Sequence, residues 1–261
     1  MPSGKRSKQQ RQAKPPPVQS KGGGGSSNFS RRTLVIAGVV LLVLIGLGVG
    51  LPLALSGSAS GHGNTQKVES MAAYGQHFQP APAPGPSGPE GPPLETGPNL
   101  APTGSPPPGG SVDGIQCQGG EQLAEHTHAR LTVFVNGRSE KVPYGVGIAS
   151  PQLQPGIGVP FVVSGSCFSW LHTHTTDGII HTEAPVHHTY TLGNFFDVWG
   201  QPLSGTQVGP AKGKVTALYN GKVWLGDPRD IPLTEHAQVQ LDVGSPLVGP
   251  VRIPGSDWAH L

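Results

Sequence analysis

The sequence predicts an all-β domain, a β-sandwich or barrel-like antiparallel fold with one short helix, preceded by a single transmembrane helix and a disordered linker. Three Asx-Gly pairs, at 136–137, 177–178 and 220–221, each separate two short segments rich in β-branched residues. Such pairs tolerate the positive φ angles of two-residue turns, so each predicts an antiparallel hairpin. Ahead of the hairpins lie one long uncharged apolar run and one stretch dominated by Pro and Gly. These two patterns are typical of a membrane span and of an unfolded tether.

Residues 1–33 form a basic head with eight Lys or Arg and no acidic residue. The rest of the chain holds nine basic and fifteen acidic residues, so the net charge of +2 conceals a strong asymmetry. The head has almost no apolar surface to bury, and we expect it to be disordered. Beside a membrane span, such charge favours attraction to anionic lipid, and no nucleic-acid partner is expected.

Residues 34–55 form the predicted transmembrane helix, and none of these 22 residues is charged. At about 1.5 Å per residue they span the roughly 30 Å hydrocarbon core of a bilayer. Arg31 and Arg32 precede the run, so the positive-inside rule places the head in the cytoplasm and the rest of the chain outside. A cleaved signal peptide with a processing site at 58–60 is the alternative, but its apolar region is usually only about 7–15 residues long. The sequence predicts a single-pass signal anchor in the cell membrane, with the lipid bilayer as the partner of 34–55.

Residues 56–112 form the predicted linker, which is small and polar at first and rich in Pro and Gly over 80–110. Pro-rich chain favours extended polyproline II structure, at about 3.1 Å per residue. We expect a disordered stalk that lifts the domain 113–261 away from the bilayer. A ligand for a partner protein or a glycosylated segment is the alternative.

The extracytoplasmic domain 113–261 consists of short β-forming segments with turn residues between them. Strands are predicted at 129–136, 138–142, 159–164, on both sides of the 177–178 turn, and at 187–191, 214–219, 222–225 and 237–243. One segment instead has helical spacing, because Leu192, Phe195, Phe196 and Trp199 recur at intervals of three and four. It predicts a short amphipathic helix that ends at Gly200 and packs its aromatic face on the sheet.

Cys117 and Cys167 are the only cysteines, and both lie outside the membrane in the predicted orientation. An isolated pair in an oxidising compartment typically forms a disulfide. Cys167 lies five residues before His172, so a role as a thiolate metal ligand or a nucleophile is the alternative.

Histidine is concentrated in the domain, in two His-x-His pairs. His126 and His128 precede the first predicted strand, and His172 and His174 precede the central turn. Alternate residues of a strand point to one face, so each pair presents its two imidazoles together. If the two strands adjoin, both pairs surround one site.

The central hairpin adds two more residues to this group. With a two-residue turn at 177–178, His174 faces His181, and His172 faces Glu183. A three-residue loop would instead turn His181 to the other face. The candidate metal ligands are therefore His172, His174, His181, Glu183, His126 and His128.

Imidazole and carboxylate groups at this spacing suit one small cation. Imidazole binds zinc, copper, nickel and iron, and the chain has only Met1 and Met71 as soft thioether ligands. A dedicated Cu(I) carrier is therefore disfavoured, and zinc or Cu(II) is predicted. A polar surface cluster and a metal-free catalytic site are the alternatives.

The segments Leu171–Glu183 and Tyr190–Gly200 resemble a family of bacterial, mostly membrane-anchored or exported proteins that carry the pattern HTHxxxGIIHxE. The resemblance covers residues 115–245. The basic, Gln-rich start followed by one span is also similar to actinobacterial exported proteins. The resemblance implies membership of this uncharacterised family but implies no activity and no ligand.

Together the patterns predict a membrane-tethered extracytoplasmic domain that binds zinc or copper for sequestration, sensing or transfer. The alternative from another class is a metal-dependent envelope enzyme, in which the three clustered histidines hold the metal and Glu183 is the general base. A non-metal interaction module on a stalk is a third. The sequence contains no GxSxG elbow, P-loop or dinucleotide-binding fingerprint, so no catalytic residue of those classes is assigned.

Overall fold

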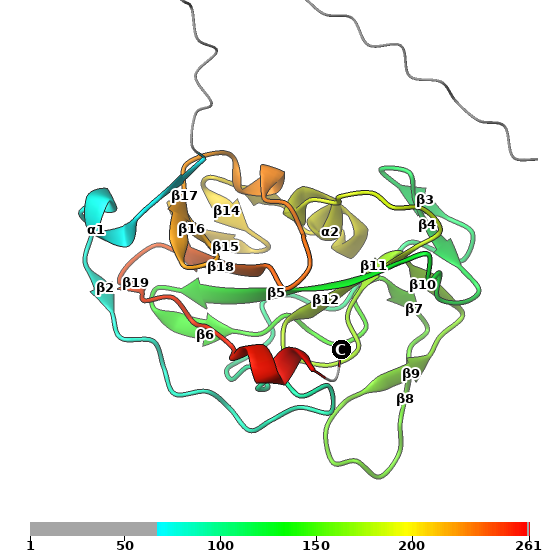
Figure 1. Cartoon of the computed structure of the whole chain (residues 1–261). Coiled ribbons are helices and arrows are strands. Elements are labelled where there is room, and N and C mark those ends of the chain that lie inside the picture. Colours follow the sequence, from blue (N-terminus) through cyan, green and yellow to red (C-terminus); the bar gives the residue numbers. More distant parts are fainter. Residues whose placement is uncertain (1–66, 260) are drawn as a thin grey trace, which may run out of the picture. The chain divides into compact units, whose positions relative to one another are not determined.

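The computed structural model describes residues 67–259 and 261, which belong to one compact unit, Gly61–Leu261 (Figure 1). The predicted head, the predicted span at 34–55 and the start of the predicted linker lie outside the described residues. Within the described ranges, no helix is long and apolar enough to cross a membrane. Strands predominate there over two short α-helices and two 3-10 helices, so the all-β class is confirmed for this part of the chain.

The main sheet has eight strands in the described region. They are β1 (Val68–Glu69), β5 (Glu125–Val135), β6 (Arg138–Glu140), β11 (Leu171–His172), β12 (Ile179–Ala184), β16 (Val215–Tyr219), β17 (Lys222–Trp224) and β18 (Gln238–Val243). Their order is β1-β17-β16-β18-β5-β12-β11, and β6 pairs with β5. β18 and β5 run parallel, whereas the sequence predicted a purely antiparallel fold. Turn residues indicate how strands that are consecutive in the sequence pair with each other. β5 and β18 are far apart in the sequence, so no turn residues indicate their pairing.

Two of the three predicted hairpins are confirmed. Asn136-Gly137 connects β5 to β6, and Asn220-Gly221 connects β16 to β17. Both central residues of each turn have positive φ, with angles of 49° and 74° in the first turn and 51° and 75° in the second. These are the angles that select Asn and Gly for a two-residue turn.

The central hairpin differs from its prediction. His172 pairs with His181, so the register is shifted by two residues and 173–178 form a longer connection. Asp177 Oδ1 accepts the Ile179 backbone N–H at 2.9 Å, so this residue shapes the end of the connection. Because side chains alternate with a period of two, a shift of two leaves His172, His181 and Glu183 on one face, as expected.

Smaller strand groups flank the main sheet. One comprises β3 (Ser111–Val112), β4 (Ile115–Gln118), β10 (Cys167–Ser169) and β7 (Ile148–Ala149), and another comprises β13 (Leu203–Ser204), β14 (Gln207–Val208) and β15 (Ala211–Lys212). Two further pairs are β2 (Phe78–Gln79) with β19 (Leu247–Val248), and β8 (Gln152–Leu153) with β9 (Val162–Ser164). The short helices are α1 (Met71–Tyr74), η1 (Pro228–Asp230) and η2 (Gly255–Trp258). The strand predicted at 187–191 does not form.

The predicted amphipathic helix is confirmed as α2 (Leu192–Trp199). Thr191 caps its first turn in a capping box with Asn194, and Gly200 ends it in the left-handed region at φ 72°. The buried face of α2 packs into the same core as the odd-numbered residues of β5 and β18. The aromatic side chains of this helix thus fill the core.

The main sheet has one apolar face and one polar face. Ala129, Leu131 and Val133 of β5 belong to the core under α2, so the even-numbered residues of β5, such as His128 and Arg130, point to the opposite face. On β18 the corresponding residues are Gln238, Gln240 and Asp242. Figure 1 shows α2 on one side of the sheet and the C-terminal segment on the other.

Two segments cover much of the polar face: residues 80–96, here called the N-terminal strap, and residues 246–259, here called the C-terminal strap. In the C-terminal strap, Val251 N–H donates to Gln240 Oε1 at 2.9 Å, and Val248 O accepts from Gln240 Nε2 at 2.9 Å. In the N-terminal strap, buried Glu95 lies 3.8 Å from buried Arg130. Polar side chains of the sheet therefore bind backbone and charged groups of the straps.

The packing of residues 67–112 corrects the predicted boundary of the domain. Leu100 and Ala101 belong to the main core, and Val68 of β1 pairs with Trp224 of β17. The disordered linker was predicted from its Pro and Gly content, which indicates only how the isolated segment would behave. In the folded protein this segment contacts the polar face of the sheet, and such contacts have no signal in its composition. The structured domain therefore extends upstream of 113, to residue 67 within the described residues.

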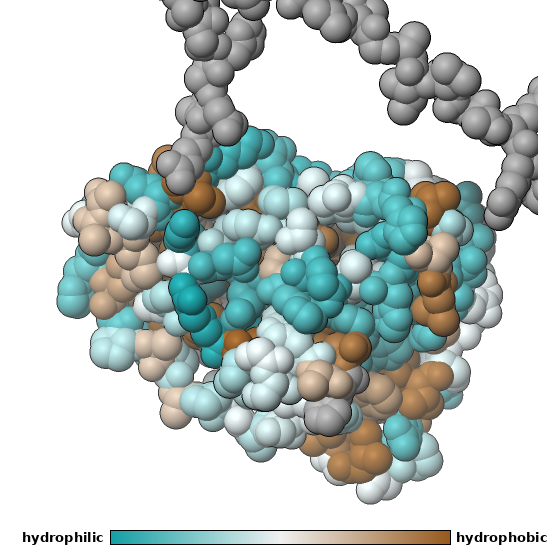
Figure 2. All heavy atoms as spheres, in the orientation of Figure 1, coloured by the Kyte–Doolittle hydropathy of each residue, from teal (hydrophilic) through white to brown (hydrophobic). Residues whose placement is uncertain are grey.

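The β8–β9 hairpin carries exposed apolar side chains, namely Leu153, Ile157 and Val163. Figure 2 shows this apolar surface where the hairpin projects. The surrounding sequence, 142–176, contains no Asp, Glu, Lys or Arg. The hairpin is therefore an uncharged projection, and its inner strand β9 borders the histidine cluster described below.

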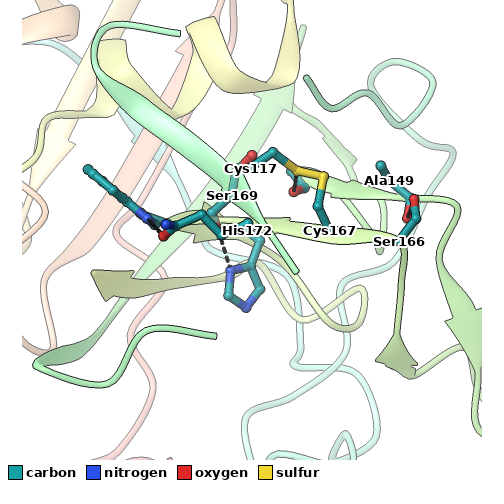
Figure 3. The surroundings of a disulfide bond; sticks show 9 residues. Cys117, Ala149, Ser166, Cys167, Ser169 and His172 are labelled. Carbon is teal, nitrogen blue, oxygen red and sulfur yellow. Dashed lines mark hydrogen bonds between the residues drawn. A yellow bond between two sulfur atoms is a disulfide. The ribbon is translucent and has the colours of Figure 1, made fainter. Parts of the chain in front are cut away.

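The disulfide between Cys117 of β4 and Cys167 of β10 is confirmed, and its two residues are 50 positions apart (Figure 3). Cys117 pairs with Ser169 across the two strands. The Ser169 carbonyl in turn lies 2.9 Å from Nδ1 of His172. The crosslink therefore holds the strand that positions one of the clustered imidazoles.

Replacing both cysteines, Cys117→Ala with Cys167→Ala, should lower the free energy of unfolding by about 3–4 kcal/mol, because the unfolded chain regains the freedom of a long loop. Urea denaturation of the oxidised protein and of the double variant measures this difference. Reduction of the unaltered protein should give a similar loss. Quantitative thiol labelling of the native protein without reductant would contradict the crosslink.

Candidate metal centre

A cluster of imidazole and carboxylate side chains lies on the polar face of the main sheet. β12 runs between β5 and β11, so His181 pairs with His128 on one side and with His172 on the other. Two positions along β12, Glu183 pairs with His126. The two His-x-His segments therefore flank one strand, as the sequence analysis expected if they adjoined.

His174 joins the cluster from the 173–178 connection, beyond the end of β11. Its Nε2 lies 3.0 Å from Nε2 of His172. Its Nδ1 lies 2.7 Å from the carbonyl oxygen of Val162, at the start of β9. The β8–β9 hairpin therefore sets the orientation of this ring.

The tautomers of His172 and His174 follow from their hydrogen bonds. The Ser169 carbonyl lies 2.9 Å from His172 Nδ1 and is drawn in Figure 3, and the Val162 carbonyl bonds His174 in the same way. A carbonyl oxygen only accepts, so each Nδ1 carries the proton and donates it. In a neutral imidazole the other nitrogen then has a lone pair. Two Nε2 lone pairs therefore face each other across 3.0 Å.

A second proton on either ring is disfavoured. Burial, reinforced by the charge on neighbouring His174 and His181, lowers the pKa of His172 well below its ordinary value. Burial and the charge on His181 also lower the pKa of His174. Two buried lone pairs at this distance repel each other unless a cation lies between them. The pair therefore has the character of a cation-binding site.

Glu183 and His181 complete a set of four ligand groups. Glu183 Oε2 lies 3.9 Å from His172 Nε2, and Glu183 Oε1 lies 3.6 Å from His181 Nδ1. These distances exceed those of hydrogen bonds. They are close to the ~3.4 Å that separates two ligands on a tetrahedral ion with bonds of about 2.1 Å. One ligand atom from each of His172, His174, His181 and Glu183 lies within 4.8 Å of the others, so the cluster can hold a metal ion.

Glu90 of the N-terminal strap reaches the same cluster. Its Oε1 lies 2.9 Å from His181 Nε2, without the alignment of a hydrogen bond. Burial opposes protonation of His181, but the Glu183 and Glu90 carboxylates outweigh burial and raise its pKa to about 10. Burial alone would raise the pKa of Glu90, yet the contact with His181 lowers it. The two carboxylates thus favour positive charge at this position, either a second proton on His181 or a bound cation that displaces it.

Sequence reasoning missed Glu90 and Glu121. Glu121 Oε1 lies 3.8 Å from His174 Nε2 at the partly exposed rim. Burial, and then the charge of Glu183, raise the pKa of Glu121. Neither residue belongs to a strand pattern, and Glu90 lies in the Pro/Gly-rich stretch, so no local signal marks them.

His126 and His128 lie on the other side of Glu183 from His172. The His126 side chain is 45% exposed, and its Nε2 is 3.4 Å from Glu183 Oε1. His128 is buried, and burial followed by the charge on His181 lowers its pKa to about 3. One ligand atom each from His126, His128 and His181 forms a second group within 4.8 Å. All six predicted ligands therefore lie in one cluster.

Three other residues that could bind a metal lie outside this cluster. His187 pairs with Glu125, and His188 packs against Tyr190. Cys167 is consumed by the disulfide, so its alternative role as a thiolate ligand or nucleophile is ruled out. The centre therefore offers nitrogen and oxygen ligands only, among the residues that the structure describes.

A comparison of the chain with models of known protein families, with curated proteins and with solved structures finds no match. The resemblance to a family with the HTHxxxGIIHxE pattern stays a prediction.

Proposed function

We propose that this chain is a membrane-tethered extracytoplasmic protein that binds zinc or Cu(II) in its buried histidine cluster, to sequester, sense or transfer the ion. The observation that carries the proposal is the pairing of His172 and His174. Each ring donates its Nδ1 proton to a backbone carbonyl, and the two Nε2 atoms converge at 3.0 Å. Metal-binding histidines are typically oriented by such a bond on the other ring nitrogen.

The donor set supports the choice of metal. Three imidazoles and one carboxylate, without thiolate or thioether, suit zinc and Cu(II) better than Cu(I). The carboxylate and imidazole contacts are also longer than hydrogen bonds, as expected of groups that meet through an ion.

Burial favours binding over catalysis. His172, His174, His181 and Glu183 are each at most 8% exposed. A catalytic metal keeps an open position that a substrate can reach, whereas a storage or structural site encloses the ion. Glu183 as a general base would need contact with a substrate, and it is enclosed by the cluster. These features support sequestration or transfer over the alternative of an envelope hydrolase.

The membrane tether is proposed from the sequence alone, on the uncharged run 34–55 and the preceding arginines. Protease added to intact cells should digest the domain and leave the N-terminal head protected. Protection of the domain with loss of the head would reverse the topology, and release of a processed form into the medium would make the run a signal peptide.

The whole chain, purified in detergent and stripped with a chelator, should take up zinc tightly at neutral pH. His174→Ala should weaken this uptake at least about 100-fold, because second-shell changes alone already weaken metal sites by about 10–100-fold. Competition with a chromogenic chelator measures the affinity. Zinc at 100 times its Kd should also stabilise the unaltered protein by about 2.7 kcal/mol.

His188→Ala is the matched control, because this exposed histidine lies outside the cluster, and it should leave uptake unchanged. If His174→Ala retains full zinc content and the same thermal shift, the cluster is a polar network and the proposal fails.

A further inference from the structure

We propose that the centre holds two cations, with a second site on His126 and His128 that shares Glu183 and His181 with the first. This inference rests on the proposed function, because it extends the same cluster. It predicts a second metal equivalent, bound nearer to solvent and more weakly than the first.

Glu183 lies between the two proposed sites. Its two oxygens face different histidine pairs: Oε2 lies 3.9 Å from His172 Nε2, and Oε1 lies 3.4 Å from His126 Nε2. Each distance is too long for a hydrogen bond and close to the ~3.4 Å expected between two ligands of one ion. A carboxylate that presents one oxygen to each of two ligand sets is placed to bridge two cations.

His181 lies between the two histidine pairs. His172 and His174 each engage one ring nitrogen with a backbone carbonyl, whereas both ring nitrogens of His181 are buried and lack a hydrogen-bond partner. Nδ1 is 3.6 Å from Glu183 Oε1, and Nε2 is 2.9 Å from Glu90 Oε1. Each nitrogen therefore has its own carboxylate beside it. A neutral imidazole has one lone pair, so His181 binds both cations only if its remaining ring proton passes to Glu90 or to water and the ring bridges as an imidazolate.

His128 has an unsatisfied ring nitrogen. Its side chain is buried, and its Nε2 has no hydrogen-bond partner, although an unpaired buried polar group is destabilising. The ring lies within the cluster, 4.7 Å from the ring of His181 and 4.8 Å from that of His126, measured between centroids. A cation bound by the group His126, His128 and His181 would satisfy this nitrogen.

The two sites differ in their access to solvent. His172 is fully buried, whereas nearly half of the His126 side chain is exposed. A cation held by His126 is therefore at the rim of the centre and exchanges more readily than one held by His172 and His174. The rim site is also the one that an incoming ion reaches first.

Zinc titration of the whole chain, followed by metal analysis after gel filtration at graded free zinc, tests the inference. The unaltered protein should bind two equivalents, the second more weakly. His126→Ala should lose the second equivalent and keep the first, and because the side chain is exposed the change should leave the fold intact. His128→Gln should do the same, with near-ultraviolet circular dichroism as the check on its fold. His187→Ala, another exposed histidine outside the cluster, should keep both equivalents.

A single equivalent in the unaltered protein, unchanged by His126→Ala and His128→Gln, would overturn the second site and leave the proposed function intact. Two bound equivalents that neither His126→Ala nor His128→Gln reduces would also overturn the second site and leave the proposed function intact. No zinc uptake at all would defeat the proposed function as well. Cobalt(II) gives a separate reading: two cobalt ions that share Glu183 should show magnetic coupling, and uncoupled ions in the doubly loaded protein would contradict the shared carboxylate.

Discussion

A chain shortened to begin at Asp113 should lose its cooperative fold and its metal uptake, even though everything that sequence patterns assign to the domain is retained. The truncation removes Leu100 from the main core, and deletion of a buried Leu side chain typically costs about 2–5 kcal/mol. It also removes Glu95, which lies beside Arg130, together with the strap that covers this part of the sheet. Domains of this kind have a total stability of only about 5–15 kcal/mol.

The loss extends to the metal centre and to the edge of the sheet. Glu90, which faces His181, is deleted, and β17 loses its pairing with β1. Far-ultraviolet circular dichroism and urea denaturation should show a broad, early transition for the shortened chain. A variant that begins at Gly61 is the control, because it lacks the head and the predicted span but keeps the strap, and it should unfold like the whole chain. A chain from Asp113 that unfolds cooperatively at the same urea concentration and binds zinc would show that the strap is dispensable.

The local elements were predictable because local chemistry determines them. Asn-Gly turns at 136–137 and 220–221 require positive φ at both positions, and few other residue pairs supply it. The α2 helix could be recognised from the spacing of its apolar residues and from Gly200, which ends it. The parallel pairing of β5 and β18 has no such marker, because those strands meet only through the packing of the whole sheet.

The candidate site was predictable for a related reason. His126 and His128 lie on one face of β5 whatever the neighbouring strands are, and the two-residue shift at the central hairpin kept His172 and His181 on that face. His174 reaches the cluster from the 173–178 connection and not from a strand. A shift of one would have separated the group. The grouping of the candidate ligands was therefore predicted correctly although the turn was not, because side chains alternate along a strand with a period of two.

The packing of the two straps on the sheet was not predictable, because the polar residues that bind them lie on the strands of the sheet. Gln238, Gln240 and Asp242 alternate with apolar residues on β18, which is the pattern of a strand with one face in water. In the structure their side chains bind backbone groups of residues 248–253. This alternation indicates that one face of the strand is polar. It does not distinguish a face that contacts water from a face covered by another segment of the protein. Glu90 was missed for the same reason.

His181→Phe should abolish tight uptake at both proposed sites, because His181 is common to both ligand groups. Phe has a similar shape, so the variant removes the two nitrogens with little change in packed volume. In the unaltered protein, Glu90 and Glu183 raise the pKa of His181 and so stabilise a positive charge between them. The variant leaves both carboxylates buried beside an apolar ring instead. Loss of one partner from such a buried pair costs about 3–5 kcal/mol, so the metal-free variant should melt well below the unaltered protein.

His128→Phe is the matched control, since it makes the same replacement at the neighbouring position on β5. It should lose only the rim equivalent and keep the tight one, because His172, His174, His181 and Glu183 remain. Zinc titration and thermal melts of both variants measure the difference. If His181→Phe keeps a tight equivalent that His174→Ala loses, the ion is held without His181, and neither the four-ligand set nor the shared imidazole is correct. If both Phe variants lose tight zinc alike, the two histidines act in a single site and the division of the cluster into a deep and a rim position is wrong.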